Sequence, residues 1–215
     1  MATPVAQEEA ASSRWEGEIL AFEAADRLQP PESGGILFTG SSSIRLWTSL
    51  AADFPDLRVL NRGFGGSQIH EVMAFADRIV FPYRPRLIVI YGGTNDLWQG
   101  RPSRVVIQDF KDFVALVHGR LPATRIAFVS IAPNPARWRL MPQFTEVNRA
   151  IRAYAASTPL VDYVDVATHM LTSEGTPRPD IYVEDRLHMN AKGYAIWRDV
   201  VGEYLRRVAS GDPAH

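Results

Sequence analysis

The sequence predicts a single α/β domain with a doubly wound sheet of five mainly parallel strands and helices on both faces. Short apolar segments alternate with helically patterned segments five times along the chain. The apolar segments are continuous rather than alternating with polar residues, which is typical of strands buried on both faces of a parallel sheet. Right-handed crossovers leave few topologies, and a five-stranded doubly wound sheet is the natural one. The predicted strands are residues 36–39, 57–60, 87–91, 126–131 and 160–166.

A helical extension is predicted over residues 1–33, packed on the outside of a domain that spans residues 34–215. Ser13 and Glu16 have the spacing of a capping box, which predicts that the helix starts there. The apolar residues that follow have helical spacing, and two prolines end the helix. These residues are Trp15, Ile19, Phe22 and Leu28, followed by Pro30 and Pro31.

Helices are also predicted between the strands, because apolar residues recur there at spacings of three and four. One pattern starts at Ile44, and others cover residues 69–80, 106–117 and 144–154. The last helix starts near Asn190, whose side chain is a favoured N-cap.

The composition argues against several classes of protein. The chain has 215 residues, 46% of them hydrophobic and 22% charged, and its net charge of −1 predicts no nucleic-acid partner. Without cysteine, it has no disulfide, thiolate nucleophile or cysteine-ligated metal. No apolar run approaches the ~20 residues of a membrane-spanning helix, and the first residues lack a signal-peptide pattern. We therefore expect a cytoplasmic protein without a membrane-spanning segment.

Polar residues of catalytic type gather in loops that follow strands. Ligands of such sheets bind beyond the carboxyl ends of the strands, so loops that are far apart in sequence meet there. Each loop alone is typical of a turn or a helix cap, but together they predict a site. The loops are residues 40–44, 61–67, 92–96 and 185–188.

These loops contain every group that acyl transfer requires. Ser42 supplies a hydroxyl, His188 a base to accept its proton, and Asp185 a carboxylate to orient the imidazole. A developing oxyanion needs several donors aimed at one point. The backbone N–H groups of Ser42 and Gly66 and the side-chain amide of Asn95 are the predicted donors.

The order of these four loops resembles that of the SGNH hydrolases, also called the GDSL esterase/lipase family. The resemblance covers about residues 34–209 and implies a flavodoxin-like fold, with neither a cofactor nor a metal. It also implies that Ser42 is the nucleophile, that Asp185 and His188 complete the triad, and that Gly66 and Asn95 join Ser42 in the oxyanion hole.

One position departs from the family pattern. The family usually has Asp just before the nucleophile, where this chain has Ser41. Ser41 and Ser43 are therefore alternatives to Ser42, and Gly65 is the alternative to Gly66. Isolated histidines such as His70 lack companions at metal-ligand spacing, so no metal site is predicted.

The predicted function is that of a serine esterase which hydrolyses small carboxylic esters through an acyl-enzyme. Short, acetyl-type acyl groups are expected because no apolar lid insertion is evident. Trp98, Arg137 and Trp138 lie near the expected mouth, where they would line an acyl or leaving-group pocket. Two alternatives stay open: an acyltransferase with the same triad, and a non-catalytic module that holds an anion at the serine loop. Whether the chain forms a homo-oligomer also stays open.

Overall fold

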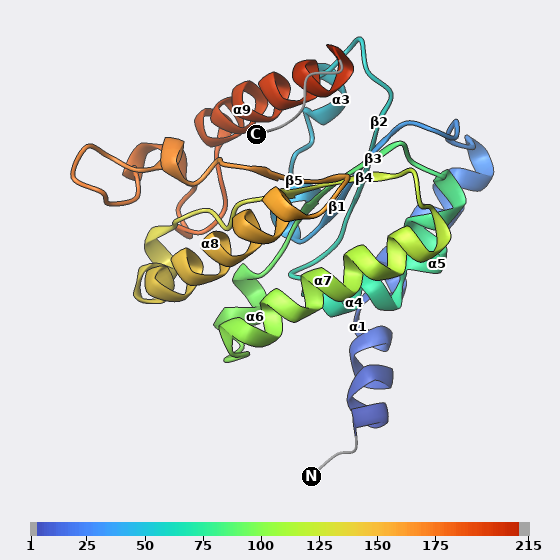
Figure 1. The fold of residues 1–215 in the computed structure, drawn as a ribbon, viewed down its shortest axis with the longest axis horizontal. Coiled ribbons are helices and arrows are strands. Elements are labelled where there is room, and N and C mark those ends of the chain that lie inside the picture. Colours follow the sequence, from blue (N-terminus) through green and yellow to red (C-terminus); the bar gives the residue numbers. More distant parts are fainter. Residues whose placement is uncertain (1–3, 211–215) are drawn as a thin grey trace.

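A five-stranded parallel sheet forms the centre of the molecule. The computed structural model describes residues 4–210, with side chains from Arg14 onward (Figure 1). The strand order is β2-β1-β3-β4-β5, that of a flavodoxin-like doubly wound sheet, which confirms the predicted fold class. The strands are β1 (Ile36–Gly40), β2 (Val59–Gly63), β3 (Leu87–Tyr91), β4 (Arg125–Val129) and β5 (Val161–Val164).

Helices cover both faces of this sheet. In Figure 1, α9 lies above the sheet and α4, α5, α7 and α8 lie below it. Each face buries its own apolar cluster, which is why the strands are apolar on both sides. The helices are α1 (Pro4–Leu28), α2 (Ser42–Arg45), α3 (Leu50–Asp53), α4 (Ile69–Ala74), α5 (Ala76–Ile79), α6 (Thr94–Trp98), α7 (Ser103–Arg120), α8 (Met141–Ser157) and α9 (Ala191–Ser210).

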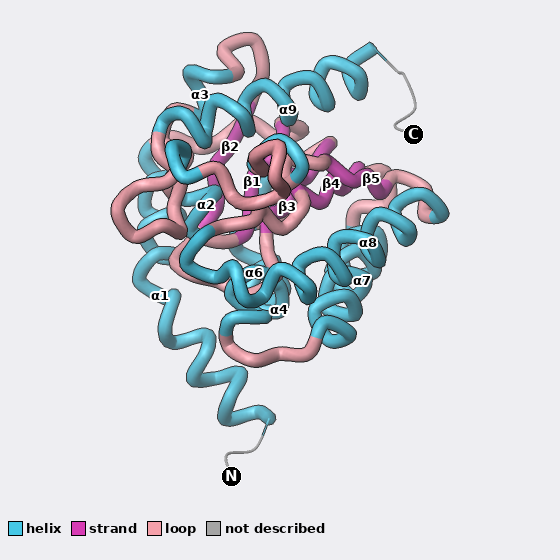
Figure 2. The backbone as a smooth tube through the Cα atoms, turned by 90° about the vertical axis from the view of Figure 1, so that its left-hand side faces the viewer, coloured by secondary structure: helices cyan, strands magenta, loops and turns pink. Residues whose placement is uncertain are grey.

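The N-terminal helix ends before the two prolines as predicted, but its start and the exposure of Leu28 differ from the prediction. It begins at Pro4, so Ser13 lies inside the helix and the predicted capping box is wrong. The preceding residues are rich in Ala, Glu and Gln, which favour the helix and extend it toward the N-terminus. Leu28 is 89% exposed and does not join the buried face. The first turns of α1 project beyond the sheet domain (Figure 2), and the later turns pack on it through Trp15 and Ile19.

Two other predicted helices are interrupted. The helix expected over residues 69–80 divides at Phe75, whose ring packs edge-on against Phe64 with ring centroids 5.7 Å apart. The pattern that starts at Ile44 forms two short helices, α2 and α3. The second strand begins at Val59 rather than at residue 57, and the fourth ends at Val129.

Asn190 caps the last helix as predicted, because its Oδ1 accepts a hydrogen bond from the Lys192 backbone N–H at 2.9 Å. No helix within residues 4–210 combines the length and apolar character needed to cross a membrane.

Candidate active site

Ser42 lies at the carboxyl edge of the sheet, in a sharp turn from β1 into α2. The strand ends at Gly40, whose φ is 117° and where a Cβ would lie 1.9 Å from the Tyr91 carbonyl oxygen. Only glycine fits this position without displacing the backbone of β3. Ser42 is the first residue of α2, so its backbone N–H has no acceptor within that helix. Its side chain is 9% exposed.

Two short hydrogen bonds connect Ser42, His188 and Asp185. The Ser42 Oγ lies 2.9 Å from Nε2 of His188, and Nδ1 of the same ring lies 2.6 Å from Oδ2 of Asp185. A carboxylate accepts from an N–H, so Nδ1 carries the proton and Nε2 is left as an acceptor for the serine hydroxyl. The structure thus brings together the three residues predicted to form a triad.

The Asp185 carboxylate is fixed by its own turn. Its second oxygen accepts the backbone N–H groups of Leu187 at 2.8 Å and His188 at 2.9 Å. Partial burial acts to raise the pKa of Asp185, but the hydrogen bonds from the His188 ring and from these two N–H groups outweigh it and lower the pKa. The carboxylate therefore stays ionised and faces the imidazole in a fixed orientation.

Gly66 and Asn95 lie beside each other. A Cβ on Gly66 would lie 3.7 Å from Asn95 Nδ2. That nitrogen donates one hydrogen bond to the Ser67 carbonyl at 3.1 Å, which leaves its second N–H for another acceptor. The neighbouring Gly65 instead donates its backbone N–H to Glu18 Oε2 at 3.0 Å. Gly66 is therefore better placed than Gly65 to offer a free N–H.

A buried carboxylate supports the loop that carries Asn95. The two oxygens of Asp96 accept the backbone N–H groups of Ile69 at 3.2 Å and Gly93 at 3.1 Å. This joins the start of α6 to the start of α4, directly after the segment that contains Gly66. Burial raises the pKa of Asp96 to about 6, although the hydrogen bond from the Ile69 N–H acts in the opposite direction. Residues 92–96 are predicted to be a loop, but α6 begins at Thr94.

A small cavity of about 20 Å³ opens beside these groups. A volume of this size holds roughly one water molecule. Both polar and aromatic side chains line the cavity. The lining includes Ser42, Asn95, Arg137, His188, Tyr91 and Tyr182.

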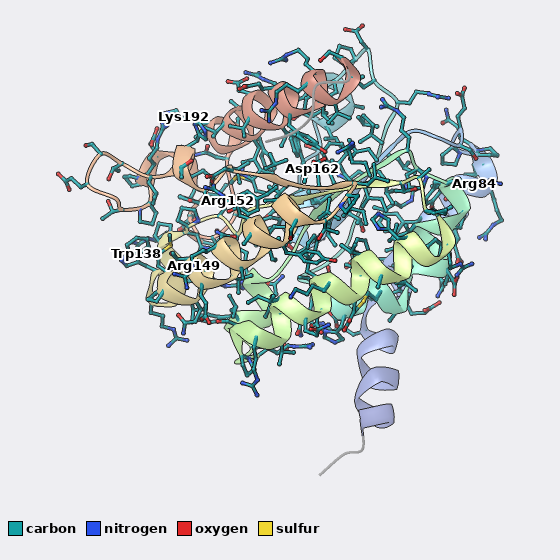
Figure 3. The ribbon with its side chains drawn as sticks, viewed as in Figure 1. Arg84, Trp138, Arg149, Arg152, Asp162 and Lys192 are labelled. Atoms are coloured by element: carbon teal, nitrogen blue, oxygen red, sulfur yellow. The ribbon has the colours of Figure 1, made fainter. Side chains whose placement is uncertain are left out.

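The three residues predicted to bind substrate lie in different places. Arg137 lines the cavity and is only 8% exposed. Trp98 and Trp138 do not line it, and their side chains are 45% and 38% exposed. Figure 3 places Trp138 near the start of α8, at the edge of the molecule. The structure therefore joins Arg137 to the site and leaves the two indoles outside the cavity.

The sequence matches a family model described as the GDSL-like Lipase/Acylhydrolase family over residues 34–196. The chain belongs to this family. This finding confirms the resemblance that the four loops predicted, and it supports a lipolytic or esterase-type hydrolase. No curated protein matches the chain at a significant level.

Solved structures of GDSL proteins share the fold of this family member. A candidate platelet activating factor from Streptococcus pneumoniae is 20% identical with a TM-score of 0.79, over 92% of this chain and 95% of that one. A GDSL-like lipase from Bacteroides thetaiotaomicron is 17% identical with a TM-score of 0.74, over 88% and 98% of the two chains. An acetylxylan esterase from Geobacillus stearothermophilus is 17% identical with a TM-score of 0.65, over 80% and 94%. At these identities the likeness shows the fold alone.

Sequence reasoning missed several residues of this GDSL-family site. Tyr91 ends β3, and the rule that ligands bind at strand ends could have included it. Asp96 follows Asn95 directly, but nothing in the sequence indicates that its carboxylate bonds to Ile69. Tyr182 lies far along the chain, and its hydroxyl donates to the Pro133 carbonyl.

Asp96 also belongs to a group of three possible metal ligands. His70, Asp96 and Asp109 each offer a ligand atom, and these atoms lie within 4.8 Å of one another. The guanidinium of Arg101 contacts the His70 ring and donates to Asp109 Oδ2 at 2.6 Å. The Arg101 guanidinium therefore supplies a positive charge to this group of ligands. Burial, with the Arg101 charge adding to it, lowers the pKa of His70 to about 4.

Proposed function

We propose that this protein is a serine esterase that hydrolyses short-chain carboxylic esters through an acyl-enzyme. The observation that carries the proposal is the chain of contacts from Ser42 Oγ to His188 Nε2, 2.9 Å, and from His188 Nδ1 to Asp185, 2.6 Å. This arrangement supplies a nucleophile, a base and an orienting carboxylate in sequence.

In the proposed mechanism, Ser42 Oγ attacks the ester carbonyl carbon while His188 Nε2 takes the hydroxyl proton. The resulting oxyanion accepts hydrogen bonds from the Ser42 and Gly66 backbone N–H groups and from Asn95 Nδ2. When the intermediate collapses, His188 returns the proton to the leaving alcohol oxygen, and the acyl group remains on Ser42. Water then attacks the acyl-enzyme with His188 again acting as base, which releases the acid and restores the serine.

The size of the cavity supports an ester substrate with a short acyl chain. About 20 Å³ beside Ser42 leaves room for an acetyl methyl group but not for a long chain. The name of one structural relative, an acetylxylan esterase, agrees with an acetyl substrate. We expect kcat/KM on p-nitrophenyl esters to fall at least about tenfold from acetate to octanoate, since a filled pocket rejects added methylenes. A preference for octanoate would contradict the short-chain assignment.

The decisive experiment compares the three adjacent serines. Ser42→Ala should lower kcat on the order of 10⁶-fold and abolish covalent labelling by a fluorophosphonate, since both require the activated hydroxyl. Ser41→Ala should retain most activity, because Ser41 Oγ has no hydrogen-bond partner among the described residues. Ser43→Ala should also retain it, because the Ser43 carbonyl that accepts from Tyr194 Oη is part of the backbone.

Each alternative has its own outcome in this experiment. An inactive Ser41→Ala with an active Ser42→Ala would place the nucleophile one residue earlier. A wild-type protein that neither reacts with the phosphonate nor cleaves an ester would fit the anion-binding module instead. Product analysis with an added alcohol distinguishes hydrolysis from acyl transfer, because a transferase would form the new ester.

A further inference from the structure

Arg137 is a buried cation within contact of the Asn95 amide. It lies in the 3₁₀ segment Pro135–Leu140 that follows β4, and its backbone leaves helical geometry there. The backbone N–H donates to Asn134 Oδ1 at 2.9 Å, which fixes the turn. The side chain then extends to the cavity, where Nη1 donates to Asn95 Oδ1 at 2.8 Å and to Thr94 Oγ1 at 3.2 Å.

No carboxylate within the described part of the chain pairs with this guanidinium. The side chains that face it are Thr94, Asn95, the Trp98 ring at 5.1 Å and Tyr91. Burial raises the pKa of Tyr91, so its phenol is neutral and supplies no counter-charge. Burial also lowers the pKa of Arg137, but a guanidinium remains charged in proteins.

A buried cation without a carboxylate costs folding free energy, because the lost hydration is not replaced by an ion pair. Arg62, the other buried arginine within the described part of the chain, pairs with the Asp26 carboxylate. Arg137 differs from it in having no carboxylate partner, and its position beside the proposed oxyanion donor points to a role in the reaction.

The contacts of Arg137 fix which way the Asn95 amide points. The amide oxygen accepts from Arg137, and the amide nitrogen donates to the Ser67 carbonyl at 3.1 Å. A flipped amide would place its N–H groups against the guanidinium and its oxygen against the Ser67 carbonyl, so both contacts would become repulsive. The amide of Asn95 is thereby held in one orientation, and the second N–H on its nitrogen is used by neither of these two contacts.

We propose that Arg137 is a positioning residue of the oxyanion hole, which orients the Asn95 amide and places a fixed positive charge behind it. This proposal rests on the proposed function, because only the tetrahedral intermediate of acyl transfer carries the new negative charge. The ester carbonyl of the bound substrate is neutral, whereas the oxyanion is fully charged. A positive charge fixed in a site of low dielectric therefore stabilises the transition state more than the bound substrate. Polarisation through the Asn95 amide strengthens its hydrogen bond to the oxyanion in the same direction.

The test is the steady-state kinetics of Arg137→Met on p-nitrophenyl acetate. We expect kcat to fall about 10- to 100-fold while KM changes less than about twofold, because the lost stabilisation belongs to the transition state. Arg137→Lys keeps the charge and should recover part of this loss. A purely structural role would instead lower thermal stability and leave the kcat of the folded fraction intact, so the unfolding temperature is measured on the same samples.

Arg139 provides a matched control. Its guanidinium packs over the same Trp98 ring, at 4.8 Å against 5.1 Å for Arg137, but it is exposed and makes no hydrogen bond to Asn95. Arg139→Met should leave kcat within about twofold of the wild type, since an exposed charge is screened by solvent. An equal loss of kcat in both variants would overturn the proposal. It would show that any positive charge near the site, or contact with the Trp98 ring, has the same effect.

A double-mutant cycle decides whether Arg137 acts through Asn95. If it does, Arg137→Met should cause a smaller loss in an Asn95→Ala background than in the wild type, because the amide it orients is gone and only the direct effect of its charge on the oxyanion remains. Losses that multiply would mean that Arg137 acts on the substrate independently, which contradicts the proposal.

Failure of this proposal is distinguishable from failure of the proposed function. An active wild type whose Arg137→Met variant keeps full kcat overturns the role of Arg137 and leaves the esterase assignment intact. A wild type with neither turnover nor phosphonate labelling overturns both. The rate of Ser42 labelling by the fluorophosphonate gives a second readout, because the phosphoryl oxygen occupies the same hole; Arg137→Met should slow it.

Discussion

Ser42 differs from the serines on either side by the hydrogen bond from its Oγ to His188. The sequence Gly40-Ser41-Ser42-Ser43 offers three hydroxyls in succession, and spacing alone does not choose among them. The start of α2 settles the direction of each side chain: Ser42 faces His188, whereas Ser41 is buried with its hydroxyl unpaired among the described residues. At the position where the family usually has Asp, the side chain of Ser41 therefore makes no hydrogen bond within the described part of the chain.

Asn95→Ala tests the oxyanion hole itself. We expect kcat to fall roughly 10²- to 10³-fold with little change in KM, because this donor matters once charge develops on the substrate oxygen. Steady-state kinetics on p-nitrophenyl acetate measure both constants. A loss confined to KM, or no loss at all, would mean that Asn95 only holds the start of α6.

The pH dependence of activity tests the roles of His188 and Asp185. A protonated imidazole cannot accept the serine proton, so activity should fall in acid. Hydrogen bonds hold the pKa of Asp185 below its usual range, so this carboxylate stays ionised and does not contribute to the acid limb. The logarithm of kcat/KM should then rise with a slope of one, and EDTA should not change it. A slope of two would indicate that Asp96, whose pKa burial raises to about 6, also affects the rate.

Removing the Asp185 carboxylate should lower kcat strongly. Asp185→Asn deprives the imidazole of its counter-charge and favours the wrong tautomer, so kcat should fall roughly 10³- to 10⁴-fold, by analogy with other triads. Unfolding measured in parallel should show a folded variant. A variant with near wild-type kcat would mean that another group orients His188.

At the scale of elements, α1 packs against the loop that carries Gly66. The Trp15 ring lies against Gly65 and 6.0 Å from the Phe64 ring, and Glu18 accepts the Gly65 N–H. Trp15→Ala should lower the free energy of unfolding by about 3 kcal/mol through the cavity it creates. Trp15→Phe should cost less, because the indole N–H that it removes has no partner among the described residues. Urea unfolding measures both; equal and negligible effects would mean that α1 does not stabilise the domain.

An element is predicted accurately when its own residues define it, and less accurately when its ends depend on contacts with residues far away in the sequence. The strand at residues 87–91 was predicted to the residue, because five consecutive apolar side chains leave no other interpretation. The end of β2 was missed because its polar residues satisfy their hydrogen bonds far away in sequence: Asn61 donates to the Ile44 carbonyl, and Arg62 pairs with Asp26. The short α6 begins after Gly93, and the adjacent glycines Gly92 and Gly93 made the segment resemble a turn in the sequence.

At the scale of the whole molecule, the sheet brings some residues of the site together, and contacts between loops bring together the others. Only the first kind could be predicted from the sequence. Parallel strands align their carboxyl ends, so the predicted parallel sheet was enough to bring the loops of Ser42, Asn95 and His188 to one edge. The contact of Arg137 with Asn95 joins two loops whose paths depend on packing between α6 and the segment before α8. Residue types and spacing do not encode such a path, which is why Arg137 was expected to contact substrate rather than the amide.

The cluster around Arg101 makes the stability of the whole fold depend on pH. His70 on α4, Asp96 on α6 and Asp109 on α7 meet there, so the cluster joins three helices on one face of the sheet. Burial and the Arg101 charge lower the pKa of His70 in the folded protein to about 4, against about 6.5 in an unfolded chain. Above pH 6.5 the ring is neutral in both states and contributes nothing. Below it the unfolded chain binds a proton that the folded protein does not, so the free energy of unfolding falls as the pH falls toward 4.

His70→Gln isolates this contribution, because glutamine can still accept from Arg101 but does not titrate. Between pH 7 and pH 4.5 the wild type should lose about 2 kcal/mol more stability than the variant, as measured by urea unfolding at both pH values. The buried Asp96 titrates in both proteins, so its opposite effect cancels in the comparison. His169→Gln, which replaces an exposed imidazole, should follow the wild type. If wild type and His70→Gln lose stability in parallel, His70 takes up its proton in the folded state and the cluster does not exclude it.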